Sequence, residues 1–269
     1  MNAFCFRYSD YPFILSIETY CSLQVAEAAV KSFQDILGSA LWTPSTKDFS
    51  SAKKMYSPYQ LRKKILVMSH AWFPFKITGS TGLDDEIDDT LKIKMILSPI
   101  TALFVEDKRI KDEEMATNPF ACSNMWARDF RTYLAAEGKK EVRMETRKNL
   151  WKVTHKDISA GVTLDPWEFW NNGVCMVGQN HSKCDKYILY GHGKFSLNGG
   201  VACGYVAKPP VLIDPQAGEP TLTTQFTFTL ISGQNLSQLI TKRNPELEYH
   251  MYVEVEFVNL SLSKSNREV

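Results

Sequence analysis

Several features that would assign a chain of this length to a function class are missing. No apolar run in the 269 residues approaches the roughly 18 residues of a membrane-spanning helix. The start of the chain lacks the basic region, apolar core and small-residue cleavage site of a secretory signal, so we expect a cytoplasmic protein. The formal net charge of +1 leaves no overall basic footprint, which argues against nucleic acid as a partner.

The distribution of cysteines argues against two further classes of protein. Six cysteines are scattered without any C-x-x-C pair. In a chain of this length that pattern predicts reduced, mostly buried thiols rather than a disulfide framework or a zinc site. The composition, 44% hydrophobic and 23% charged, is that of a globular protein.

One stretch organises the rest of the chain, the run YPFILSIETYCS at residues 11–22. Residues 13–17 are almost all apolar, which predicts a strand buried on both faces, as in a parallel sheet. Glu18 follows that strand directly. Acidic groups at the carboxyl end of a strand tend to do chemistry in α/β barrels, because the active site is built on that rim. Taken alone, Glu18 is more simply a residue that ends a strand.

The order of the later elements predicts parallel α/β units. Ser22 can cap a helix whose apolar residues recur at helical spacing as far as Gly38. An aromatic-rich turn at residues 165–173 favours core packing over ligand stacking. The predicted strands are residues 13–17, 65–68, 100–105, 150–153 and 174–177, the predicted helices are residues 22–38 and 125–136, and residues 41–59 are a predicted loop.

Two further segments depart from this pattern. Residues 78–90 are rich in aspartate and predict an exposed acidic linker, without the twelve-residue pattern of a calcium loop. Residues 226–230 and 251–257 alternate apolar and polar side chains, as antiparallel strands with one buried side do. A parallel α/β domain is therefore predicted to be followed by the beginning of an all-β domain.

Separated segments of the chain resemble, in order, the eukaryotic phosphoinositide-specific phospholipases C. YPFILSIETYCS and SPYQLRKKILV resemble the end of the family's X region. WEFWNNGVCMVGQN and GKFSLNGGVACGYVAKPPVL are similar to its Y region, and FTLISGQNL resembles the first strand of its C2 domain. The acidic stretch falls where the family has its X–Y linker.

The resemblance implies an incomplete TIM-like (β/α) barrel followed by the start of a C2-type sandwich. The implied domains are the end of the X region at residues 1–77, the acidic linker at 78–98, the Y region at 99–213 and a partial C2 domain at 214–269.

The resemblance also implies a reaction, calcium-dependent hydrolysis of phosphatidylinositol 4,5-bisphosphate to diacylglycerol and inositol trisphosphate at a membrane surface. Glu18 matches the family's carboxylate at this strand end, a calcium ligand and candidate general base. His70 and Lys152 fall at degenerate versions of the positions that bind the substrate's phosphates. Association with the membrane is expected to be peripheral, and the protein regulators are not implied.

The sequence departs from the family in ways that leave two hypotheses open. The five histidines do not fall in the family's two catalytic histidine motifs, S-H-N-T-Y and Y-H-G, so this chain by itself is expected to be inactive. Met68, Ala121 and Thr154 stand at positions where the family resemblance implies polar or stacking side chains. The chain is interpreted either as part of an active phospholipase C or as an inactive relative that binds inositides or serves as a scaffold. The simpler alternative is an incomplete gene product that does not fold by itself.

Overall fold

A computed structural model describes residues 2–45, 48, 54–71, 88–107, 109–111, 116–155, 163–183, 185–196, 203–214, 216–218, 227, 229, 231 and 232. The chain divides into two compact units, Met1–Pro215 and Gln216–Val269. The fold that follows is that of the first unit.

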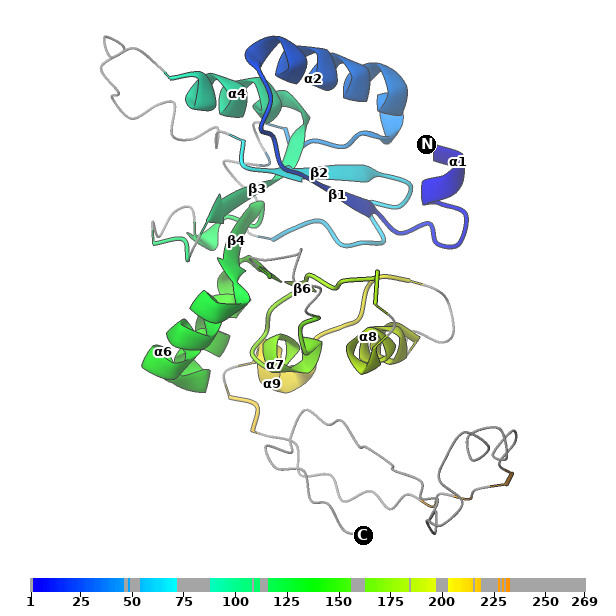
Figure 1. Cartoon of the computed structure of the whole chain (residues 1–269), viewed down its shortest axis with the longest axis vertical. Helices are drawn as coiled ribbons and strands as arrows, with labels where there is room; N and C mark the ends of the chain where they lie inside the picture. Colours follow the sequence, from blue (N-terminus) through cyan, green and yellow to red (C-terminus); the bar gives the residue numbers. More distant parts are fainter. Residues whose placement is uncertain are drawn as a thin grey trace, which may run out of the picture. The chain divides into compact units, whose positions relative to one another are not determined.

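Strands and helices alternate along this unit, as the sequence predicts (Figure 1). The strands are β1 (Phe13–Ile17), β2 (Ile65–Ser69), β3 (Thr101–Asp107), β4 (Ala121–Trp126), β5 (Leu150–Thr154) and β6 (Met176–Val177). The helices are α1 (Asn2–Cys5), α2 (Leu23–Leu37), α4 (Asp89–Leu97), α6 (Ala127–Lys148), α7 (Pro166–Trp170), α8 (Lys186–Ser196) and α9 (Pro210–Ile213), with 3-10 turns η1 (Gly38–Ala40) and η3 (Ser98–Ile100).

The six strands form one sheet in the order β1-β2-β3-β4-β5-β6. Every pairing is parallel, so all six carboxyl ends lie at the same edge. The strands form a half-barrel, which confirms the α/β class and the incomplete barrel that the sequence predicts. We call the edge that holds the carboxyl ends of the strands the rim.

The burial of the first strand differs from the prediction. β2 is buried along its whole length, whereas Phe13 in β1 is 43% exposed. The expectation that β1 is buried on both faces is therefore wrong. Its physical reason is position, since β1 is the first strand of the described sheet and pairs only with β2.

Two helices cover the outer side of the first strands. Helix α2 begins after Ser22 and ends where Gly38 takes a positive φ of 49°, so the predicted helix is confirmed. It packs beside α4, as Figure 1 shows. Helix α4 occupies part of the segment assigned to an acidic linker, because the Asp88 carboxylate accepts a hydrogen bond from the Leu91 backbone N–H at 2.7 Å and caps it. Residues 72–87 lie outside the described residues.

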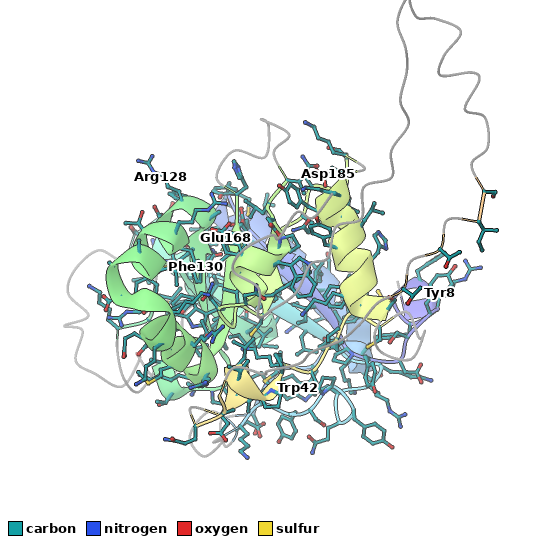
Figure 2. The ribbon with its side chains drawn as sticks, turned by 90° about the horizontal axis from the view of Figure 1, so that it is seen from below. Tyr8, Trp42, Arg128, Phe130, Glu168 and Asp185 are labelled. Atoms are coloured by element: carbon teal, nitrogen blue, oxygen red, sulfur yellow. The ribbon has the colours of Figure 1, made fainter. Side chains whose placement is uncertain are left out.

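An aromatic cluster joins α6, α7 and β5. The Phe130 ring lies 5.5 Å from the Phe169 ring and 6.2 Å from the Trp151 ring, and all three side chains are buried. Figure 2 shows Phe130 directed inward from α6 and Arg128 directed away. The predicted core role of the 165–173 aromatics is confirmed for Phe169. Helix α6 runs beyond the predicted residue 136, with a kink at Gly138.

The concave face of the sheet has its own apolar cluster, formed chiefly by Met68, Leu103, Val105 and Cys122. Burial raises the pKa of the Cys122 thiol to about 12, so this thiol stays protonated at neutral pH. The cysteines of the described residues are free thiols, as the sequence predicts, but only Cys122 and Cys203 are buried, so the expectation of mostly buried thiols is wrong. Among the described helices, none has the length and apolar character needed to cross a bilayer.

The predicted C2 sandwich is not seen among the described residues. The strands expected at residues 226–230 and 251–257 fall outside them, apart from Thr227 and Thr229, which are in no strand. The sandwich therefore stays a prediction.

Candidate functional site

The three predicted site residues lie at or near the rim. Glu18 directly follows β1, His70 directly follows β2, and Lys152 lies in β5. Because Ile17 of β1 pairs with Ser69 of β2, Glu18 and His70 stand at equivalent positions one residue beyond the pairing. The parallel register thus brings together residues that are far apart in the sequence.

Two rim residues were missed from the sequence, Asp107 and Asn124. Asp107 is the last residue of β3 and pairs in register with Asn124 of β4. The Asn124 side-chain amide donates a hydrogen bond to Asp107 Oδ1 at 2.8 Å, and the same oxygen lies 3.7 Å from His70 Nε2. Asp107 had a readable signal, because it belongs to the acidic pair Glu106-Asp107 that follows the apolar run of residues 100–105.

Asp107 and Asn124 differ in how far their side chains are exposed to solvent. Asp107 has a 69% exposed side chain, whereas Asn124 is 8% exposed. The Asn124 carbonyl Oδ1 is buried without a hydrogen-bond partner among the described residues. Since Nδ2 is fixed by the Asp107 carboxylate, Asn124 holds Asp107 in place from below, and Asp107 in turn faces His70.

Lys152 contacts the opposite end of the sheet. Its Nζ donates a hydrogen bond to Ser16 Oγ of β1 at 3.2 Å, although β5 and β1 are four strand intervals apart. In a flat sheet four intervals span about 19 Å, at ~4.8 Å each, which no lysine side chain bridges. The contact is therefore direct evidence of curvature. Met68 pairs with Ser16 in register and adds an apolar side chain to the same layer.

Negative charge gathers where β1 and β3 end. The Tyr20 hydroxyl donates a hydrogen bond to Glu18 Oε2 at 3.3 Å. The pKa of Tyr20 is raised, mainly by the Glu18 charge and to a smaller extent by the charge of Asp107. Both carboxylates therefore act on one hydroxyl at the solvent-facing rim.

The rim residues do not complete a calcium site by themselves. Calcium takes roughly six to eight oxygen ligands. Among the described residues no group of three or more His, Cys, Asp or Glu side chains is placed to hold a metal ion. Glu18 and Asp107 offer carboxylate oxygens, but the described set does not fit the ion, and we derive no step through it.

Two of the positions where the sequence departs from the family, Thr154 and Ala121, lie at opposite ends of their strands. Thr154 ends β5 and so belongs to the rim. Ala121 begins β4 and is fully buried at the opposite end of that strand, so the side chain there does not reach the rim. Asn124 lies closer to the carboxyl end of β4 than Ala121 does, in register with Asp107 at the end of β3.

The fold and this rim define a class, a half-barrel of parallel strands with a polar carboxyl edge. Residues 1–71 match the X domain of phosphatidylinositol-specific phospholipase C, and residues 100–211 match the Y domain of the same enzymes. The chain belongs to the phosphatidylinositol-specific phospholipase C family.

The curated relatives are distant. The chain is 24% identical to 1-phosphatidylinositol 4,5-bisphosphate phosphodiesterase delta-3-A of Danio rerio, over 97% of this chain and 37% of that protein. It is 26% identical to the zeta-1 phosphodiesterase of Homo sapiens, over 88% of this chain and 43% of that protein. The chain thus spans well under half the length of these relatives.

Solved structures support the fold. The crystal structure of L. pealei PLC21 aligns with a TM-score of 0.59 at 19% identity, covering 77% of this chain and 28% of that one. The crystal structure of S. officinalis PLC21 aligns with a TM-score of 0.61 at 19% identity, covering 79% and 28%. At this identity the likeness concerns the architecture alone.

Proposed function

We propose that this chain is the barrel portion of a phosphoinositide phospholipase C that hydrolyses phosphatidylinositol 4,5-bisphosphate to diacylglycerol and inositol trisphosphate in intracellular signalling. The observation that supports the proposal is the parallel register that puts Glu18 and His70 side by side at one edge of the sheet, with Lys152 reaching β1 from the middle of β5. The names of the curated relatives support the substrate, because they are phosphatidylinositol 4,5-bisphosphate phosphodiesterases.

Each of the three residues has a role in this proposal. Lys152 and His70 offer N–H donors to the phosphates of the headgroup, while Asn124 and Asp107 hold His70 at the rim. Glu18 would supply one carboxylate ligand to a calcium ion whose other ligands lie outside the described residues, and such an ion would offset charge on the phosphate. The protein works in the cytoplasm and associates peripherally with the membrane.

A second function is favoured by the contacts of Lys152 inside the half-barrel. The Lys152 ammonium is already hydrogen-bonded to Ser16, and the neighbouring Met68 presents no polar group. A pocket altered in this way suits a catalytically inactive relative that binds inositides or serves as a scaffold. Both functions require an inositide at the rim, and they differ in catalysis.

Binding is tested with phosphatidylcholine liposomes that contain or lack phosphatidylinositol 4,5-bisphosphate, by co-sedimentation. We expect the chain to prefer the inositide liposomes. Lys152→Gln is expected to weaken binding about fivefold, since one lysine near an anionic surface is worth about 1 kcal/mol. Lys31→Gln, the same change at an exposed position of α2, serves as the matched control. Equal sedimentation with both liposomes contradicts both functions.

Catalysis is tested on the longest natural protein that contains this sequence, beside the chain by itself. We expect calcium-dependent release of inositol trisphosphate from the longer protein, abolished by Glu18→Gln, and none from the chain alone. Inositide binding without release by the longer protein at any calcium concentration favours the inactive relative.

A further inference from the structure

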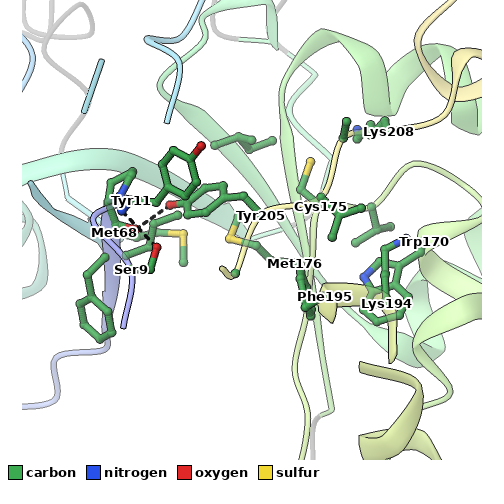
Figure 3. Close-up of a pocket in the computed structure, with 18 of the residues that line it drawn as sticks. Ser9, Tyr11, Met68, Trp170, Cys175, Met176, Lys194, Phe195, Tyr205 and Lys208 are labelled. Carbon is green, nitrogen blue, oxygen red and sulfur yellow. Dashed lines mark hydrogen bonds between the residues drawn. The ribbon is translucent and has the colours of Figure 1, made fainter. Parts of the chain in front are cut away.

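A second concave feature lies mainly at the amino ends of the strands and extends to Ser16 of β1 and Met68 of β2. It is a cavity of about 600 Å³, within the usual range for small-molecule sites (Figure 3). We call it the amino-end cavity. Its walls come from the start of β1, the start of β6, the end of α8 and the segment at residues 204–209. Glu18, His70 and Lys152 do not line it.

The lining is largely apolar. Ile14, Met176 and Phe195 line the cavity together with the ring of Trp170. Figure 3 shows Met176, Phe195 and Trp170 gathered along one stretch of it. Such a surface is suited to a hydrocarbon chain, because burial of apolar area is the main source of affinity in sites of this kind.

A tyrosine closes one side of the cavity. The Tyr205 hydroxyl donates a hydrogen bond to the Pro12 carbonyl at 2.8 Å, and its ring lies edge-on to the Tyr11 ring at 5.9 Å (Figure 3). Burial raises the pKa of Tyr205 to about 12, so this wall is neutral at physiological pH. Tyr205 therefore fixes the shape of the cavity and brings no charge to it.

Lys194 brings positive charge to the lining of the amino-end cavity. Its ammonium lies 4.9 Å from the Trp167 ring centroid and 4.8 Å from that of Trp170. Burial lowers the pKa of Lys194, and within the described part of the chain no carboxylate forms an ion pair with it. Lys208 also lines the cavity, but its ammonium donates to the Gly173 carbonyl at 2.7 Å and to the Thr146 carbonyl at 3.2 Å. Lys194 is thus the cation with capacity for a ligand.

We propose that the amino-end cavity binds a long-chain fatty carboxylate, with its hydrocarbon chain along the apolar walls and its carboxylate on Lys194. One ammonium matches one carboxylate, whereas a dianionic phosphate would leave part of its charge unpaired in an apolar site. The rings of Trp167 and Trp170 orient the ammonium, so little side-chain freedom is lost on binding. The cavity shares Ser16 and Met68 with the layer that Lys152 contacts, but Lys194 and the residues of the proposed inositide site, Glu18, His70 and Lys152, are different groups.

The requirement for a long hydrocarbon chain on the ligand is tested by isothermal titration calorimetry, with dodecanoate below its micelle concentration and with acetate. We expect dodecanoate to bind and acetate to give no heat. Gly204 lines the cavity, and a Cβ there would meet no atom within 4 Å, so Gly204→Leu adds a bulky side chain to the lining without a clash at its first atom. We expect it to weaken dodecanoate binding at least about tenfold. Gly193→Leu, equally free of neighbours but not part of the cavity lining, is the control.

The head-group requirement is tested with Lys194→Gln, with Lys31→Gln as the matched charge control. We expect Lys194→Gln to weaken dodecanoate about tenfold and to leave the binding of neutral dodecanol unchanged. No heat with dodecanoate, or equal binding by the Lys194 and Lys31 variants, overturns the proposal. Inositide sedimentation of Lys194→Gln should remain at the wild-type value, so failure here is distinguishable from failure of the proposed function.

Discussion

The turn at Gly173 offers a quantitative test of how the half-barrel is packed. Gly173 has a φ of +85°, in the left-handed region. An alanine Cβ at this position would collide with the Thr146 hydroxyl and would lie 3.0 Å from Thr146 Cβ. Thr146 cannot readily move away, because it is 1% exposed and its hydroxyl donates to the Asn172 carbonyl at 2.9 Å.

The expected effect of Gly173→Ala has three parts. Left-handed backbone costs an alanine roughly 1–2 kcal/mol. Forcing a methyl group into a packed site costs roughly 1–3 kcal/mol. The alanine restricts the unfolded chain, which returns roughly 0.4–1 kcal/mol. We therefore expect the free energy of unfolding to fall by about 2–4 kcal/mol.

Urea unfolding followed by tryptophan fluorescence measures this loss. Gly138→Ala is the control, because Gly138 also has a positive φ, +83°, but no atom lies within 4 Å of its Cβ position. We expect the control to lose about 1–2 kcal/mol, from backbone strain alone. In a Thr146→Ala background the effect of Gly173→Ala should shrink by about 1–2 kcal/mol. The packing argument is refuted if the two glycine variants lose the same stability and Thr146→Ala changes nothing.

Two further predictions concern a hydroxyl and an ion pair. In the folded state the pKa of Tyr205 is about 12 instead of 10.0, so between these pH values the unfolded chain holds fewer protons and the free energy of unfolding falls as the pH rises. Full burial would make this fall ~2.7 kcal/mol, and partial exposure reduces it to about 1–2 kcal/mol. Tyr205→Phe should remove that part of the alkaline loss in urea titrations, and an unchanged pH profile would contradict this reasoning. Arg131 forms two hydrogen bonds of 2.7 Å to the Glu168 carboxylate, but its side chain is 52% exposed. Glu168→Gln should therefore cost only about 0.5–1 kcal/mol, less at high salt, and a salt-independent loss above this range would argue against a surface ion pair.

Much of the fold follows from local sequence patterns. The apolar runs at residues 13–17 and 65–68 predict β1 and β2, and Gly38 predicts the end of α2, because strand burial and helix termination are decided by a few adjacent residues. Strand β4 and helices α4, α8 and α9 were not predicted, and the helix predicted from residue 125 begins at Ala127, after β4. Helix α8 contains two glycines, which weaken any local helix signal.

The candidate site was only partly predictable for a different reason. Glu18 stands out because it ends an apolar run, but Asn124 is significant only through its register with Asp107. The contact between Lys152 and Ser16 depends on the curvature of the whole sheet. Strand register and sheet curvature are set by packing between distant segments, so they cannot be predicted from a local sequence pattern.

The hydrogen bond between the Tyr205 hydroxyl and the Pro12 carbonyl has a consequence for how the family's two regions work together. Pro12 lies in the stretch that matches the X domain, and Tyr205 lies in the stretch that matches the Y domain. Lys152 and Ser16 make a second bond between the same two stretches. X and Y therefore lie in one compact unit and contribute strands to the same sheet. Proteolytic cleavage between them would yield halves that each lack partners for their closing contacts, so co-expressed halves would have to assemble before either site described above could form.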